Sequence, residues 1–278
     1  MTDITDAPST SAPAVLATHQ LRLGYGGTIV VDGVSTRIPP GRITAIVGPN
    51  GCGKSTLLRG LARLLDPVAG TVRLAGDDLS RLPARTVATE LGLLPQQPTA
   101  PDGITVSDLV ARGRHPHQRW FRQWNREDER AVAQALSATS ITELADTPVD
   151  QLSGGQRQRV WIALALAQNP GIMLLDEPTT YLDLAHQLDI LNLLADLNRR
   201  LDRTIVMVLH DLNMASRYAH HLIALRDGRI ATEGEPADVV NPDLMREVFG
   251  VTATVIPDPV VGTPMVVPHP RPTGASHG

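Results

Sequence analysis

A glycine-rich stretch, Gly48-Pro49-Asn50-Gly51-Cys52-Gly53-Lys54-Ser55-Thr56, constrains this chain more than any other feature. It follows an apolar run over residues 43–47, which predicts a buried strand, and opens into an apolar-periodic segment over 57–65, which predicts a helix. Strand, glycine-rich turn and helix are the context that a phosphate-binding loop requires. An ordinary turn that happens to contain Lys and Ser is the alternative, and the two flanks argue against it.

The residue types of this loop suit a nucleotide polyphosphate. Glycines let backbone N–H groups approach phosphates closely, and a helix N-terminus adds unpaired N–H groups and a positive dipole end. Lys54 is expected to reach the β- and γ-phosphates, and the Ser55 hydroxyl to ligate Mg²⁺. The same positive end is expected to favour the thiolate of Cys52. The predicted phosphate-binding residues are Gly48, Asn50, Gly51, Cys52, Gly53, Lys54, Ser55 and Thr56.

Composition narrows the class of protein. The chain has 278 residues, 42% apolar and 19% charged, with a formal net charge of −4, an ordinary globular profile. A nucleic-acid partner normally leaves a basic footprint, so this charge argues against one. The single cysteine suits a reducing compartment. The sequence lacks a secretory signal and an apolar run of about 18 residues, which predicts a cytoplasmic protein without a membrane span.

The order of segments predicts an α/β fold with an insertion. Residues 16–23 are expected to form an edge strand of an antiparallel β edge, and strand–helix alternation dominates the rest of the core. Strand-like runs disappear from residue 98 to about 147, and an inserted helical subdomain is predicted over about 98–165. Within it, 113–124 has the composition of a basic and aromatic linker. Tails over 1–15 and 268–278 are rich in small and polar residues and are expected to be disordered.

Two further motifs support a nucleotide site. The apolar run 172–175 ends in Asp176 and Glu177, where a strand end can place one carboxylate on Mg²⁺ and the next as a general base for an attacking water. A strand capped by solvated acids is the alternative. Ser153, Gly154, Gly155 and Gln156 precede a helix and form a second anion-binding end, with an ordinary Ser153 N-cap as the alternative.

Together these motifs resemble the ATP-binding subunit of an ATP-binding-cassette (ABC) transporter, over about residues 16–267. The resemblance implies a RecA-like P-loop NTPase core, with ATP and Mg²⁺ as cofactors. It implies that Tyr25 stacks on adenine, that Gln96 links Mg²⁺ and the attacking water to the helical subdomain, and that His210 contacts the γ-phosphate. Asp183 falls at the D-loop aspartate, although that loop begins with Thr180 where serine is commoner.

Several residues have alternative interpretations. Tyr25 could pack on the sheet, and His210 could be a hydrogen-bonded histidine at a strand end. Gln97 is the alternative to Gln96. His115 and His117 are interpreted as a solvated loop and not as metal ligands. Trp120, Phe121 and Trp124 are interpreted as subdomain core or permease-facing surface.

Within the family, three stretches resemble ferric-siderophore importers, the ferric enterobactin importers above all: 104–106 with 113–117, 176–183, and 258–264. The implied function is ATP hydrolysis that powers import through a separate permease at the cytoplasmic face of the membrane. Cobalamin or haem import, a non-transport cassette ATPase and a regulatory module without turnover are the alternatives. The implied partners are permease subunits, a second copy arranged head to tail and, indirectly, a periplasmic or surface binding protein.

Overall fold

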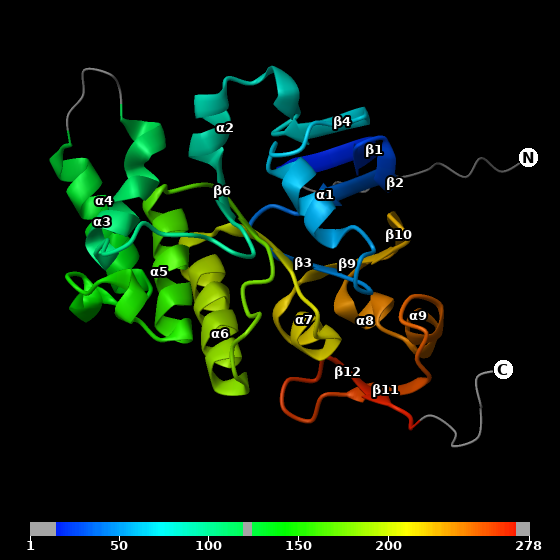
Figure 1. The fold of residues 1–278 in the computed structure, drawn as a ribbon. Coiled ribbons are helices and arrows are strands. Elements are labelled where there is room, and N and C mark those ends of the chain that lie inside the picture. The colour runs from blue at the N-terminus through cyan, green and yellow to red at the C-terminus, as the bar shows by residue number, and fades with distance from the viewer. Residues whose placement is uncertain (1–14, 119–123, 271–278) are drawn as a thin grey trace, which may run out of the picture.

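The structure is a computed structural model that describes residues 15–118 and 124–270. Most of both predicted tails, as well as Trp120 and Phe121, lies outside these residues. Two sheets and a group of helices make up the described chain (Figure 1). The elements agree with the predicted α/β class, with helical segments inserted between strands.

The larger sheet has six strands in the order β10-β9-β3-β8-β7-β6. Adjacent strands in this sheet pair in parallel, except that β10 pairs antiparallel to β9. Every residue of β3, β7 and β8 is buried, as expected for a parallel sheet covered on both faces. The strands are β3 (Ile43–Val47), β6 (Leu91–Leu94), β7 (Ile172–Leu175), β8 (Thr204–Val208), β9 (His221–Arg226) and β10 (Arg229–Gly234).

The antiparallel strands form a second sheet in the order β2-β1-β4-β5. The prediction that residues 16–23 form an edge strand is wrong, because β1 pairs with β2 on one side and with β4 on the other. The second partner lies about fifty residues further along the chain, so local alternation could not reveal it. The strands are β1 (Leu16–Tyr25), β2 (Thr28–Ile38), β4 (Ala69–Leu74) and β5 (Asp77–Asp78).

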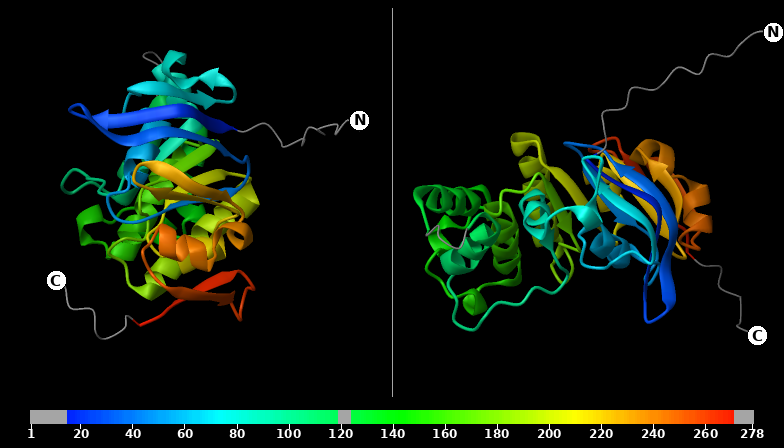
Figure 2. Two further views of the ribbon diagram at one scale, coloured as in Figure 1. Left: turned by 90° about the vertical axis from the view of Figure 1, so that its right-hand side faces the viewer. Right: turned by 90° about the horizontal axis from the view of Figure 1, so that it is seen from above.

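Helix α1 (Lys54–Leu61) packs between the two sheets, because its buried leucines belong to the apolar cluster that contains β1, β2 and one face of the larger sheet. Helices α3 to α5 stand together at one end of the molecule (Figures 1 and 2). The remaining helices are α2 (Ala84–Glu90), α3 (Val106–Ala111), α4 (Arg126–Ala138), α5 (Gly154–Ala167), α6 (Leu184–Leu201), α7 (Leu212–Tyr218), α8 (Pro236–Val239) and α9 (Pro242–Glu247). Short 3₁₀ helices are η1 (Leu79–Arg81), η2 (Arg112–His117), η3 (Thr142–Leu144) and η4 (Val149–Gln151).

The first half of the predicted basic linker is folded structure, which corrects that interpretation. Residues 112–117 form η2, and Arg114 is only 3% exposed. Its Nε lies 2.9 Å from Oδ1 of the buried Asp128 on α4, and its Nη1 donates to the Ala167 carbonyl oxygen at 2.8 Å. A buried guanidinium with these partners ties η2, α4 and α5 together.

A hairpin of β11 (Ala253–Pro257) and β12 (Pro264–Pro268) closes the described chain beneath α7 (Figure 1). Pro268 pairs with Ala253, so the predicted tail boundary at 267 falls inside this hairpin. The buried Asp258 carboxylate accepts N–H bonds from Val260 and Val261 and pairs with Arg217 of α7 at 2.7 Å. The siderophore-type stretch 258–264 is therefore a turn anchored to α7.

The buried pair makes a testable prediction about stability. Arg114→Ala leaves the Asp128 carboxylate buried without its cation, so we expect the free energy of unfolding to fall by about 3–5 kcal/mol. Urea unfolding followed by circular dichroism measures the change. Arg112→Ala is the matched control, since Arg112 is exposed, and is expected to stay within about 0.5 kcal/mol of the parent. Equal losses in both variants would contradict the proposed importance of the pair.

Candidate functional site

The candidate site lies at the carboxyl edge of the larger sheet. The segments that follow β3, β6, β7 and β8 meet there, because parallel strands end at the same edge. They enclose a pocket of about 410 Å³. It is lined by Val30, Asn50, Gly51, Gly53, Lys54, Ser55, Thr56, Gln96, Glu177, Thr180, Tyr181 and His210.

The phosphate loop has a backbone that its glycines permit. Gly48 has a φ of 150°, and a Cβ on it would lie 2.2 Å from the Leu225 carbonyl oxygen. Gly53, at the N-cap of α1, has a φ of 102° in the left-handed region. The helix begins at Lys54, three residues earlier than predicted, because Leu57 donates to the Gly53 carbonyl oxygen. Backbone N–H groups of the first helical turn therefore adjoin the pocket.

The loop's two functional side chains have partners within the protein. Lys54 Nζ donates to the carbonyl oxygens of Gly48 and Pro49, both at 2.9 Å. Ser55 Oγ donates to Oδ1 of Asp176 at 2.7 Å. Burial raises the pKa of the Asp176 carboxyl above its ordinary value, and the Ser55 hydrogen bond offsets part of that effect. A nearly buried carboxylate beside a hydroxyl favours a cation at this position.

Glu177 has the most partners among the pocket residues. Its Oε2 accepts Gln96 Nε2 at 2.6 Å and Thr180 Oγ1 at 2.9 Å, and its Oε1 lies 2.7 Å from His210 Nε2. Burial acts to raise the pKa of Glu177, but the hydrogen bonds from His210, Thr180 and Gln96 outweigh it and lower the pKa. The residue has a φ of 53°, an uncommon conformation for a residue other than glycine. The pocket thus holds an ionised carboxylate with its oxygens fixed.

The structure also distinguishes between the two glutamines and adds residues that the sequence did not single out. Gln96 lines the pocket and contacts Glu177, whereas Gln97 is not among the lining residues. Val30 of β2 and Tyr181 also line it. The sequence could have indicated Thr180, because its hydroxyl lies three residues after the Glu177 carboxylate, a spacing that suits a local side-chain hydrogen bond.

Of the predicted site residues, Gly48, Cys52 and Asp176 are not among the pocket-lining residues but belong to segments that form the pocket. Three further predicted binding elements lie outside the pocket lining. Ser153 is the N-cap of α5 and forms a capping box with Gln156, so the alternative that Ser153 is a helix cap is confirmed. The N-terminal end of this helix is nevertheless exposed. Asp183 is the N-cap of α6, where it accepts the His186 N–H at 2.9 Å. Tyr25, at the end of β1, is 46% exposed, and Arg59 Nη1 lies 3.5 Å from its hydroxyl. These groups are available to a ligand or a second molecule.

The two histidines of the predicted basic linker, His115 and His117, belong to η2. His117 Nε2 lies 2.7 Å from the Gln168 carbonyl oxygen, and His115 is exposed. Within residues 15–118 and 124–270, no group of three or more His, Cys, Asp or Glu side chains is placed to hold a metal ion. Trp124 is 42% exposed.

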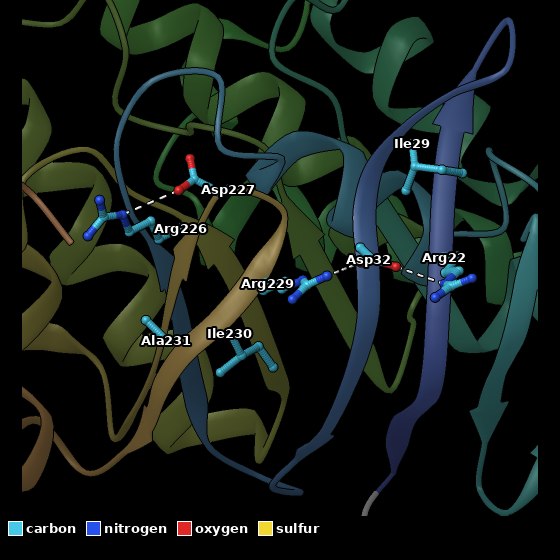
Figure 3. A pocket seen from close by; sticks show the side chains of 8 residues that line it. All are labelled: Arg22, Ile29, Asp32, Arg226, Asp227, Arg229, Ile230 and Ala231. Atoms are coloured by element: carbon cyan, nitrogen blue, oxygen red, sulfur yellow. Dashed lines mark hydrogen bonds and ion pairs between the residues drawn. The ribbon is translucent and has the colours of Figure 1, made fainter. Parts of the chain in front are cut away.

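A second depression of about 710 Å³ lies behind the phosphate loop, between β1, β2 and the β9–β10 hairpin (Figure 3). Asp32 of β2 pairs there with Arg22 of β1 and with Arg229 of β10, each at 2.8 Å or less. The hairpin turn also bonds to both neighbours, because Gly228 donates to the Cys52 carbonyl oxygen and accepts from the Asp32 N–H. This cluster fastens the antiparallel sheet to the core and supports the phosphate loop.

Comparison with known proteins identifies the family. Residues 31–180 match the family described as ABC transporter. The chain is 55% identical over 258 residues, 93% of its length and 94% of the relative, to the "Probable siderophore transport system ATP-binding protein YusV" of Bacillus subtilis (strain 168). It is 54% identical over 259 residues, covering 93% and 96%, to the "Ferric enterobactin transport ATP-binding protein FepC" of Escherichia coli (strain K12).

A solved structure described as an inward-facing conformation of a putative metal-chelate type ABC transporter superimposes with a TM-score of 0.80. It is 29% identical and covers 93% of this chain and 98% of that one. The chain therefore belongs to the ABC transporter family, and the predicted fold and family resemblance are confirmed. Among the described helices, none has the length and apolar character needed to cross a bilayer.

The structure corrects the expectation for Cys52. Its side chain is buried, and burial raises the pKa of the thiol despite the nearby Lys54 charge, because desolvation outweighs the positive helix end. We expect maleimide labelling of the native protein at pH 7 to be at least about tenfold slower than in urea, and to accelerate as the pH rises. Mass spectrometry measures both rates.

MgATP is expected to slow labelling of Cys52 further, since the residue belongs to the loop predicted to wrap the phosphates. Lys54→Ala is the control in which nucleotide should give little protection. Fast native labelling, equal to that of the unfolded chain, would contradict the burial argument. Equal labelling with and without saturating nucleotide would contradict the binding argument.

Proposed function

We propose that this chain is the ATP-hydrolysing subunit of an importer, and that it powers uptake of a ferric siderophore through a separate membrane permease. The observation that carries the proposal is the fixed Glu177 carboxylate beside the phosphate loop. A nucleotide-binding module without turnover does not require an ionised carboxylate held at that position. The proposed location is the cytoplasmic face of the membrane, where the chain is bound to its permease.

The phosphate loop binds the ATP polyphosphate through the N–H groups of Asn50, Gly51, Cys52, Gly53 and the first turn of α1. Lys54 exchanges its two loop carbonyl partners for β- and γ-phosphate oxygens, which are stronger acceptors for an ammonium group. Tyr25 is exposed and available to stack on the adenine.

The oxygen ligands at Ser55 and Asp176 suit Mg²⁺. A hydroxyl and a buried carboxylate 2.7 Å apart are hard ligands, and phosphate oxygens and water complete such a site. Gln96 supplies a further oxygen from the neighbouring strand end. When bound, the ion neutralises charge on the transferring phosphoryl group.

Glu177 accepts a proton from the attacking water, and its low pKa keeps it ionised for that role. His210 and Gln96, which hold Glu177 in the structure, lie on the pocket lining where they can turn to the γ-phosphate and to the ion. The groups proposed for ATP hydrolysis therefore follow four strands, β3, β6, β7 and β8, and the order of these strands in the sheet brings the groups together.

A second copy completes the site. The N-terminus of α5, with Ser153, Gly154, Gly155 and Gln156, and the α6 cap Asp183 lie outside the pocket of their own chain. An exposed helix end with free N–H groups suits a phosphate supplied by another molecule. We assign it to the ATP of a partner copy in a head-to-tail homodimer, whose closure drives the permease. A substrate-binding protein outside the membrane acts on this subunit only indirectly.

The cargo assignment is supported by the two relatives at 54–55% identity, whose names specify siderophore and ferric enterobactin transport. The stretch 258–264 lies away from the nucleotide pocket and forms the anchored hairpin turn, so the chemistry common to all cassettes does not require it. It is free to differ between importers of different cargo.

The role of Glu177 makes the first prediction of function. Glu177→Gln keeps the side-chain shape and loses the base, so we expect ATP binding to persist and turnover to fall at least about 100-fold. An ATP-bound dimer should then accumulate, which size-exclusion chromatography with MgATP detects beside a phosphate-release assay. Lys54→Ala is the control that should neither dimerise with ATP nor hydrolyse it. Turnover of Glu177→Gln at the parental rate would remove Glu177 from this role.

The cargo makes a second prediction. In cells that depend on this subunit, Lys54→Ala should abolish uptake of radio-iron supplied as a siderophore complex, because transport requires ATP turnover. Cobalamin and haem uptake, measured in parallel, should continue. Normal siderophore uptake together with collapsed cobalamin uptake would overturn the cargo assignment and leave the ATPase assignment intact.

A further inference from the structure

We infer that Thr180 is a positioning residue that holds the Glu177 carboxylate in place for water attack. The inference rests on the proposed role of Glu177 and deepens it. Thr180 Oγ1 donates to Glu177 Oε2 at 2.9 Å, and the Thr180 N–H donates to the Glu177 carbonyl oxygen at 3.2 Å. The two residues are thus bonded through both backbone and side chain within one turn after β7.

The backbone of this turn requires such support. Glu177 has a φ of 53° and Tyr181 a φ of 65°, both in the left-handed region that residues with a Cβ adopt at a cost. Thr180 lies between them in sequence, and its side chain is partly buried. A hydroxyl bonded to the carboxylate fixes the side-chain direction of Glu177 in a turn whose backbone is already constrained.

The other two donors to Glu177 have different tasks. Gln96 extends from β6 and His210 follows β8, and the proposed function assigns both to the nucleotide and its ion. Both side chains are more exposed than that of Glu177, with His210 at 45% and Glu177 at 9%. When Gln96 and His210 turn to the nucleotide, Thr180 is the donor that can stay on the carboxylate.

The β-branched side chain suits this task better than serine does. A methyl group on Cβ restricts χ1, so the hydroxyl keeps one direction at a smaller entropy cost. Serine retains the donor with more rotational freedom, and valine retains the shape without the donor. Comparing threonine, serine and valine at position 180 therefore distinguishes the effect of the hydrogen bond from the effect of side-chain packing in the turn.

The experiment compares Thr180→Val, Thr180→Ser and Thr180→Ala in a steady-state ATPase assay, with ATP affinity measured separately by a fluorescent nucleotide. We expect Thr180→Val and Thr180→Ala to lower kcat roughly tenfold with unchanged ATP affinity, because a hydrogen bond to a charged group is lost. The kcat of Thr180→Ser should stay within about threefold of the parent, since the donor remains. Thr179→Val is the matched control, because the Thr179 side chain makes no hydrogen bond within the described residues, and it should retain parental kcat.

A double-mutant cycle tests whether Thr180 acts through Glu177. In the Glu177→Gln background, Thr180→Val should lower the residual single-turnover rate by less than about twofold, since the base that it positions is absent. Three results would each overturn the inference: parental kcat in Thr180→Val, a defect in Thr180→Ser as large as in Thr180→Val, or a tenfold loss when Thr180→Val is added to Glu177→Gln. If Glu177→Gln itself turns over normally, the proposed role of Glu177 fails and this inference fails with it; if Glu177→Gln is inactive and Thr180→Val is normal, only this inference fails.

Discussion

The hydrogen bond from Ser55 to the buried Asp176 carboxylate is the interaction on which the site depends. It joins the first turn of α1 to the end of β7, across the intervening strand β8. Burial raises the pKa of Asp176, and the Ser55 hydrogen bond offsets only part of that effect, so a cation beside the carboxylate would stabilise its charged form. Ser55 follows Lys54 and Asp176 precedes Glu177, and Lys54 and Glu177 line the same pocket beside this bond.

The surrounding architecture keeps that edge of the sheet rigid. The parallel strands β3, β7 and β8 are fully buried, and α1 is packed between two sheets. Behind the phosphate loop, the Asp32 ion pairs and the Gly228 bonds connect the antiparallel sheet to the core (Figure 3). At the far end, the buried Arg114–Asp128 pair joins η2 to α4 within the helical group.

The site combines groups on one constrained turn with more exposed groups from other strand ends. Thr180 and Glu177 belong to one constrained turn, whereas Gln96 and His210 reach the carboxylate from other strand ends and are more exposed. In the proposed dimer, the N-termini of α5 and α6 approach the partner's nucleotide. Binding energy of ATP can thus be converted into dimer closure, because some of the proposed phosphate ligands belong to the other copy.

Short-range patterns of glycine, charge and apolar periodicity in the sequence were enough to predict the phosphate loop, the Asp176-Glu177 strand end and the α/β class. The family resemblance, and not a local pattern, pointed to Gln96 and His210. Tertiary structure decided what depends on distant partners. It placed β1 inside a sheet, buried Arg114 against Asp128, and raised the pKa of Cys52 where the local helix end predicted the opposite. Desolvation and strand pairing depend on residues far away along the chain, so local patterns could not determine them.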